Sequence, residues 1–184
     1  MAKERIILGI DPGTNIMGYG LIKQTGNKIN LITMGVLKLG QYQNHSLKLK
    51  KIFERTLGLI EQYKPDELAI EAPFFGKNVQ SMLKLGRAQG VAMAAGLYKD
   101  IPIFEYSPKK IKQSITGKGG ASKEQVAAML KNILLFKELP TYLDATDGLA
   151  AAVCHFFQGD NPGTEKSYDS WKGFIKDNPG RLKK

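Results

Sequence analysis

The chain has little cysteine and histidine and no long apolar run. Its 184 residues include one cysteine and two histidines. Cys154 therefore cannot form an internal disulfide, and it has no Cys or His partners at zinc-site spacing. No stretch approaches the roughly 18 apolar residues that a membrane span needs, and the N-terminal segment lacks the apolar region of a signal peptide. We therefore expect a cytoplasmic protein in which Cys154 is a core residue and His45 and His155 are structural or surface residues.

Acidic residues are also fewer than basic ones. The chain has 27 Lys and Arg against 17 Asp and Glu, a formal net charge of +10. Such an excess suits a polyanionic partner, with nucleic acid the first candidate and an anionic membrane surface the second. No strongly amphipathic basic helix favours the membrane, so nucleic acid is the better candidate.

Periodicity predicts an α/β fold built on a mixed five-stranded sheet that helices cover. The expected strands are residues 6–11, 17–24, 29–37, 67–71 and 101–106. The first three form an antiparallel meander, and the later ones alternate with helices and run parallel. The expected helices are residues 46–65, 78–97, 107–115 with Ser107 as N-cap, 122–136 with a capping box from Ser122 to Gln125, and a last helix from about Leu143.

The chain divides into one domain and a tail. Residues 1–158 carry the periodic segments, whereas residues 159–184 are rich in charge and turn formers. We expect residues 159–184 to be a polar, basic tail of a composition typical of disorder, unless Trp171 and Phe174 dock it locally.

Two predicted strands end in a carboxylate. Asp11 closes the first strand, and Glu71 closes the strand after the first helix. Strands in these positions are usually parallel neighbours joined by a right-handed crossover, so both side chains would lie at one edge of the sheet, where ligands bind. Taken singly, Asp11 before Pro-Gly can be a turn residue and Glu71 a surface residue.

The last helix opens with two further acids in an otherwise small and apolar run. Asp144 and Asp147 are three residues apart and fall on nearly the same side of a helix. They can share a metal ion, or they can favour the positive end of the helix dipole and act as caps. Together with Asp11 and Glu71 they would make four carboxylates at one site, which repel one another unless divalent cations bind. Hard oxygen ligands favour Mg²⁺ or Mn²⁺, and two such ions suit displacement at a phosphodiester.

Lysines and aromatic residues offer a nucleic-acid surface. Five lysines and no acid lie between Ser107 and the start of the next helix: Lys109, Lys110, Lys112, Lys118 and Lys123. They can bind phosphates or simply form a solvated face. Phe74 and Phe75 closely follow Glu71 and can stack on bases or pack in the core.

One helix carries small residues at a spacing of four. Gly86, Gly90 and Ala94 allow another element to come close, either within the domain or from a second copy of the chain.

Five ordered motifs resemble the RuvC family of Holliday junction endonucleases, within the ribonuclease H-like fold. They run from about Ile6 to Phe157 and read "GIDPGTNIMGYGLI", "AIEAPFF", "SMLKLGRAQGV", "IPIFEYSPKKIKQSITGKGGASKEQV" and "DATDGLAAAVCH". The resemblance implies a homodimeric, Mg²⁺-dependent nuclease that makes paired, symmetry-related nicks in four-way DNA junctions in recombination and repair. Mn²⁺ is expected to substitute, with one or two ions per subunit, and a branch-migration complex is the further partner.

The resemblance also assigns residues. It carries the catalytic, metal-binding quartet onto Asp11, Glu71, Asp144 and Asp147, and all four positions are acidic here. It favours Phe74 as a junction wedge and Lys112 and Lys123 as DNA contacts, and it tips the small-residue stripe toward a dimer contact.

Two rival functions start from the same residues. "GIDPGT" followed by "GYGLI" also resembles the first phosphate loop of actin-like ATPases, but 184 residues leave no room for the second domain and second phosphate loop that they need. A catalytically inactive nucleic-acid-binding scaffold on the same fold is the other, and the intact quartet argues against it.

Overall fold

A five-stranded mixed sheet forms the centre of the computed structural model, which describes residues 4–74 and 78–159. The strand order is β3-β2-β1-β4-β5, with the first three strands antiparallel and β4 and β5 parallel to β1. The strands are β1 (Glu4–Asp11), β2 (Ile16–Thr25), β3 (Lys28–Lys38), β4 (Glu67–Glu71) and β5 (Ile103–Tyr106). The predicted fold class and hairpin are therefore confirmed.

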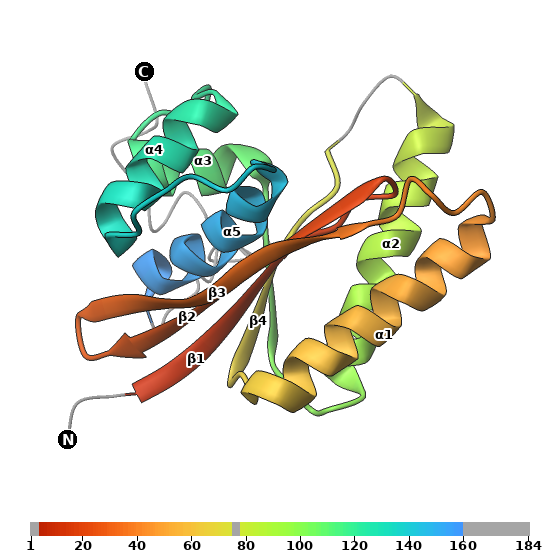
Figure 1. Ribbon diagram of the computed structural model, residues 1–184, viewed down its shortest axis with the longest axis horizontal. Helices are drawn as coiled ribbons and strands as arrows, with labels where there is room; N and C mark the ends of the chain where they lie inside the picture. The colour runs from red at the N-terminus through yellow and green to blue at the C-terminus, as the bar shows by residue number, and fades with distance from the viewer. Residues whose placement is uncertain (1–3, 75–77, 160–184) are drawn as a thin grey trace, which may run out of the picture.

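Helices cover both faces of the sheet (Figure 1). On one face, α1 (His45–Tyr63) and α2 (Val79–Leu97) run side by side. On the other, α5 (Asp144–Gln158) lies against the sheet, with α3 (Pro108–Thr116) and α4 (Lys123–Leu134) beside it. Each face has its own apolar core. No helix of the described residues is long and apolar enough to cross a membrane.

The local signals that predicted the helices are present in the structure. Ser107 caps α3 with Pro108 in its first turn, and Ser122 and Gln125 form the capping box of α4. The predicted strand over residues 101–106 is shorter, because Pro102 has no N–H for the ladder and β5 begins only at Ile103. The predicted tail lies outside the described residues from position 160 on, with Trp171 and Phe174.

Strand alternation decides which face each side chain of β1 meets. Ile7 lies in the core under α5, whereas Leu8 and Ile10 lie in the core under α1 and α2. Since successive side chains point to opposite faces, Asp11 projects toward the α5 face. On β4, Ala69 lies in the α5 core, so Glu67 and Glu71 share that face.

Glycines bring the backbone of α5 directly onto the sheet. A Cβ on Gly148 would lie 2.5 Å from backbone atoms of Gly18 and Tyr19, and one on Gly9 would lie 2.2 Å from the carbonyl oxygen of Gly148. A Cβ on Gly18 would lie 1.8 Å from the carbonyl oxygen of Asp144. Only residues without a Cβ permit this approach, which places the first turn of α5 next to the end of β1.

A buried polar chain holds the other end of α5. Nδ1 of His155 lies 2.6 Å from the Tyr106 hydroxyl, and its Nε2 lies 2.8 Å from Glu67. Glu67 accepts from Arg5, which in turn donates to Gln24. His155 is thus a structural residue, as predicted, because its partners on the sheet satisfy both ring nitrogens.

Substituting Gly148 tests the close approach of α5. We expect Gly148→Ala to lower the free energy of unfolding by about 1–3 kcal/mol, because the added methyl group meets sheet backbone that cannot move aside. Urea unfolding measures the change. Gly58→Ala is the matched control, since nothing lies within 4 Å of its Cβ position in α1, and alanine there should stabilise by about 0.5–1 kcal/mol. Equal stability of Gly148→Ala and wild type would contradict the argument.

Candidate active site

The ends of two parallel strands bring the first two acids together. Ile10 of β1 is paired with Ile70 of β4, so Asp11 and Glu71 follow as neighbours at the same sheet edge. Both face α5, as the alternation of the strands requires. The predicted placement of these two carboxylates is confirmed.

The first turn of α5 supplies the other two acids. Asp147 lines the same cavity as Asp11 and Glu71, whereas Asp144 lies one turn earlier. Leu143 is the N-cap of α5 and no side chain makes a cap hydrogen bond there, so capping by hydrogen bonds is wrong for both aspartates. Both nevertheless lie in the first turn, where the helix dipole favours acids.

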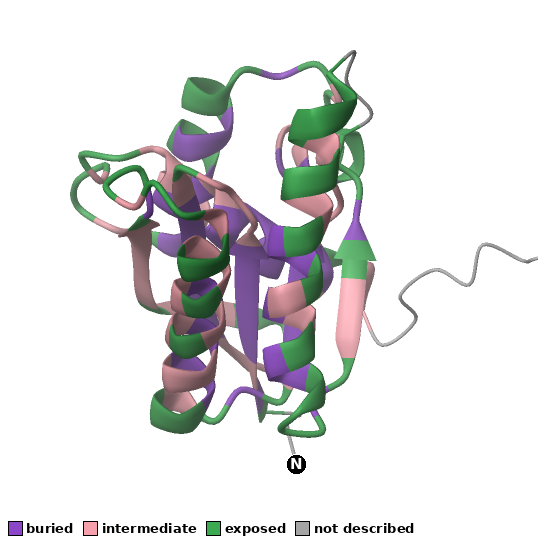
Figure 2. Ribbon diagram, turned by 90° about the vertical axis from the view of Figure 1, so that its right-hand side faces the viewer, coloured by how far each residue is buried: buried purple, intermediate pink, exposed green. Residues whose placement is uncertain are grey.

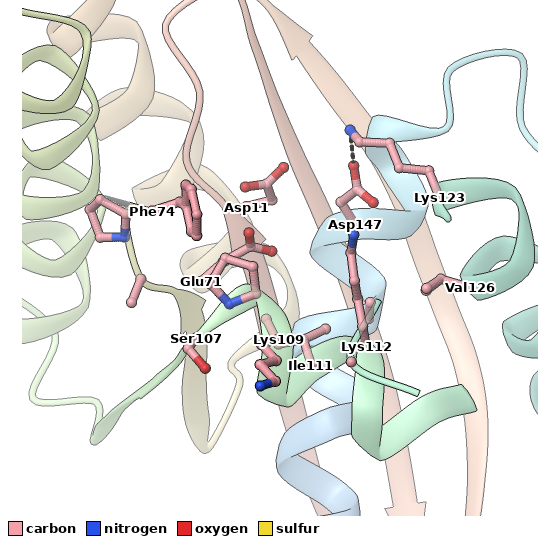
Figure 3. Close-up of a pocket in the computed structure, with 15 residues that line it drawn as sticks. Asp11, Glu71, Phe74, Ser107, Lys109, Ile111, Lys112, Lys123, Val126 and Asp147 are labelled. Carbon is pink, nitrogen blue, oxygen red and sulfur yellow. Dashed lines mark hydrogen bonds and ion pairs between the residues drawn. The ribbon is translucent and has the colours of Figure 1, made fainter. Parts of the chain in front are cut away.

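A lysine contacts both aspartates of α5. Nζ of Lys123, the first residue of α4, lies 2.5 Å from Asp147 and 3.4 Å from Asp144. Figure 3 shows its side chain reaching across to Asp147. The lysine therefore neutralises part of the acidic charge and fixes one aspartate.

Burial and mutual repulsion raise the pKa values of the acids. Burial raises the pKa of Asp11 well above its ordinary value, and the negative charges of Glu71 and Asp147 add to this. Burial, followed by the charge of Asp147, raises the pKa of Glu71 to about 7. Burial also raises the pKa of Asp147, against the opposing effect of Lys123. Burial alone would lower the pKa of Lys123, yet its hydrogen bond to Asp147 and the charges of the aspartates raise it above its ordinary value.

The acids open into a cavity of about 860 Å³ (Figure 3). It lies between the sheet edge, the loop after β4, and helices α3, α4 and α5. Apolar groups, including Pro108, Ile111 and Val126, line much of its wall. Asp11, Glu71 and Asp147 point into it, and Lys112 and Lys123 line it beside Asp147.

The donor set fits a hard divalent cation. Carboxylate oxygens that repel one another are the ligands that Mg²⁺ and Mn²⁺ prefer. As the side chains stand, no three acidic, His or Cys residues of the described chain converge to ligand distances. Asp147 is instead directed at Lys123. Binding an ion therefore requires side-chain rotation and a shift of Lys123.

The other predicted site residues lie at different distances from the acids. Phe74 is 71% exposed and lines the rim of the cavity, so the core-packing alternative is wrong for it. Phe75 lies outside the described residues. Lys112 and Lys123 line the cavity, whereas Lys118 is exposed in the loop after α3 and does not.

Sequence patterns missed two features of this site. Lys123 was expected to contact DNA, but it is also the counter-ion of Asp147, which only the packing of α4 against α5 reveals. The pairing of glycines on β1, β2 and α5 was also missed, because spacing along the chain does not show which glycines meet.

Comparison with known proteins agrees with these features. Residues 7–155 match the family described as crossover junction endodeoxyribonuclease RuvC. The chain belongs to the RuvC family. A RuvC protein of Cytophaga hutchinsonii is 65% identical over 181 residues, covering 98% of this chain and 89% of the relative. That of Bacteroides fragilis is 63% identical over 183 residues, covering 98% of this chain and 97% of the relative.

Solved RuvC structures share the fold. Thermus thermophilus RuvC in complex with a Holliday junction substrate matches with a TM-score of 0.77 and 32% identity, over 83% of this chain and 93% of that chain. The yeast mitochondrial resolvase Ydc2 matches with a TM-score of 0.62 at 15% identity, over 93% of this chain and 83% of that chain, and shows the fold alone. The ribonuclease H-like fold of the RuvC family, predicted from the sequence, is confirmed.

The raised pKa of Glu71 predicts a pH-dependent gain from Glu71→Gln in metal-free buffer. The folded protein holds this proton up to about pH 7, whereas the unfolded chain loses it near 4.5. Rising pH between these values therefore lowers the stability of the wild type. We expect Glu71→Gln to exceed wild type by about 1–3 kcal/mol at pH 8 and to lose this advantage at pH 4.5, measured by urea unfolding with EDTA.

A surface glutamate provides the control. Glu61 is half-exposed and pairs with Lys99, so Glu61→Gln should show no comparable gain at pH 8. Divalent metal should stabilise the wild type at pH 8 more than it stabilises Glu71→Gln. A Glu71→Gln variant less stable than wild type at pH 8 without metal would contradict the assignment.

Proposed function

We propose that this protein resolves four-way DNA junctions by metal-dependent hydrolysis of paired, symmetry-related phosphodiesters. The observation that carries the proposal is the convergence of Asp11, Glu71 and Asp147 in one cavity, where burial and repulsion raise their pKa values. Like charges that are buried together lower the stability of the fold, so their presence points to a functional site. Membership of the RuvC family supports the junction as substrate.

Asp11, Glu71 and Asp147, with Asp144 beside them, would hold one or two Mg²⁺ ions, for which Mn²⁺ should substitute. When bound, such ions activate water and stabilise the leaving oxygen of a phosphodiester. The carboxylates orient this chemistry from two rigid strands and one helix. Lys123 holds Asp147 and adds positive charge where a phosphate would enter.

Groups around the cavity suit a DNA strand. Lys112 and Lys123 present positive charge at its wall, and Lys118 extends this charge outward. The exposed Phe74 at the rim would stack on an unpaired base near the junction centre, with Phe75 next to it in sequence. An inactive scaffold is less favoured, because binding alone gives no reason to bury three carboxylates.

A homodimer would supply the second active site that paired nicks require. The outward face of α2 carries an apolar stripe of Val79, Leu83, Gly86, Gly90, Ala94 and Leu97, most of it exposed. Nothing lies within 4 Å of the Cβ positions of Gly86 and Gly90, so packing within the described chain does not explain these glycines. Figure 2 shows the outer surfaces of α1 and α2 uncovered. We propose that this stripe meets its copy in a second chain, and that a branch-migration complex delivers junctions to the dimer in the cytoplasm.

Cleavage of a synthetic four-way junction tests the catalytic proposal. We expect wild-type protein with Mg²⁺ to nick two opposed strands, and Asp11→Asn to slow this by roughly 10³-fold or more while junction binding persists. Denaturing gels follow the nicks, and a linear duplex tests selectivity. Asp100→Asn is the control at an exposed aspartate outside the cavity. Binding without cleavage by wild type in Mg²⁺ and in Mn²⁺ would favour the scaffold.

Disrupting the stripe tests the dimer. Gly90→Arg places a large charged side chain at its centre, and we expect monomers by sedimentation at micromolar concentration where wild type is dimeric. Gly58→Arg is the matched control, because Gly58 also has open space but lies on α1. A monomeric wild type, or a dimeric Gly90→Arg, would refute the assigned interface.

A further inference from the structure

Positive charge gathers in the N-terminal halves of α1 and α2. Neither α1 nor α2 has an acid in its first turn, yet Lys48 lies in the first turns of α1, and Lys84 and Arg87 lie in the second and third turns of α2. Cations near a helix N-terminus oppose the helix dipole and lower helix stability. Lys48 therefore opposes the dipole of α1, while Lys84 and Arg87 add positive charge further along α2.

The three side chains form one electropositive group across the two helices, the α1–α2 basic group. Helices α1 and α2 lie side by side (Figure 2). His45, the first residue of α1, lies between the charges: burial lowers its pKa, and the positive charges of Arg87, Lys84 and Lys48 lower it further. The charged groups that lower the pKa of His45, from its own helix and from α2, are all cationic.

Nearby lysines are paired, whereas those of the basic group are not. Lys50 and Lys51 both contact Glu54, and Lys99 contacts Glu61. Lys84 and Arg87 are exposed, and no carboxylate within the described ranges forms an ion pair with either. Lys48 donates to the carbonyl oxygen of Thr14, which leaves its charge uncompensated. The α1–α2 basic group therefore has positive charges that no carboxylate of the described residues neutralises and that an anion can bind.

The basic group adjoins the candidate active site on the side away from Lys112, Lys118 and Lys123, the α3–α4 lysines. Thr14, which Lys48 contacts, lies three residues after Asp11. A second cavity of about 250 Å³ runs from Asp11 and Glu71 past Phe74 to Leu85, the neighbour of Lys84 on α2. Figure 1 shows α3 and α4 on one side of the carboxyl edge of the sheet and the starts of α1 and α2 on the other.

We propose that Lys84 and Arg87, with Lys48 behind them, form a second phosphate-binding site for the DNA backbone on the α1–α2 side of the carboxylates. This inference rests on the proposed function. The α3–α4 lysines and the α1–α2 basic group then hold the DNA on both sides of the cleaved phosphate, so the acids do not repel it from the site.

The salt dependence of junction binding tests this site in the full-length protein. Binding of a fluorescent four-way junction is measured by anisotropy in EDTA, which prevents metal-dependent cleavage, over a range of salt concentrations. Removing a phosphate contact lowers the slope of log K against log salt by about 0.9. We expect Lys84→Gln/Arg87→Gln to lower the slope by roughly 1.8 and the affinity at ~0.1 M salt by roughly 10-fold or more.

Matched variants separate a local contact from net charge. Lys50→Gln/Lys51→Gln removes the same two charges from α1 but from residues paired with Glu54, and should change the slope much less. Lys84→Arg/Arg87→Lys keeps both charges and should bind like wild type. Lys84→Gln alone, on the side of α2 away from the apolar stripe, should lower the slope by about 0.9 without affecting the dimer.

The outcomes distinguish this proposal from the catalytic one. If Lys84→Gln/Arg87→Gln and Lys84→Gln bind with the slope and affinity of the Lys50→Gln/Lys51→Gln control, the second site is refuted, whatever the protein cuts. If wild type binds junctions but does not cut them in Mg²⁺, the catalytic proposal fails, while a lowered slope in the Lys84 and Arg87 variants still supports the site.

Discussion

Contact between the backbone of α5 and the backbone of β1 and β2 is the constraint on which the site depends. Gly9, Gly18 and Gly148 leave no side chain between helix and sheet. Asp147 therefore stands beside Asp11 although 136 residues separate them in sequence. A helix packed on the sheet at the usual side-chain distance would hold the α5 acids farther from the strand ends.

The distance between two acids on β4 matches the distance between the two residues of α5 that interact with them. Glu67 and Glu71 are four residues apart on a strand, about 13 Å, and Asp147 and His155 are eight residues apart on a helix, about 12 Å. Glu67 contacts His155, and the negative charge of Asp147 contributes to the raised pKa of Glu71. The contact between His155 and Glu67 thus fixes how far α5 is shifted along β4. This contact in the core therefore sets the position of Asp147 relative to Glu71 at the edge of the sheet.

Strand ends, caps and helix periodicity were readable in the sequence because they depend on neighbouring residues. Asp11 and Glu71 could be paired because parallel strands joined by a crossover end at one edge, and the structure confirms this pairing. The ambiguity of Asp144 and Asp147 could not be resolved in the same way. Capping and metal binding use the same residues at the same spacing, and only the structure shows that no side chain caps α5 and that Lys123 reaches both acids from another helix. Contacts between distant segments, such as Gly18 with Asp144, produce no periodic pattern in the sequence from which they could be predicted.

The charge of the molecule is arranged as an acidic centre within a basic surface. A net charge of +10 attracts DNA, yet buried carboxylates at the proposed point of cleavage would repel the phosphate that must reach them. Burial, together with the repulsion between the acids, keeps the pKa values of Asp11 and Glu71 raised despite the positive charge of Lys123. Divalent cations would remove the remaining repulsion and bind the phosphate at the same time. In the proposed complex, cations on both sides of the acids, on α3–α4 and on α1–α2, would hold the neighbouring phosphates, so that binding of DNA and binding of metal would each favour the other.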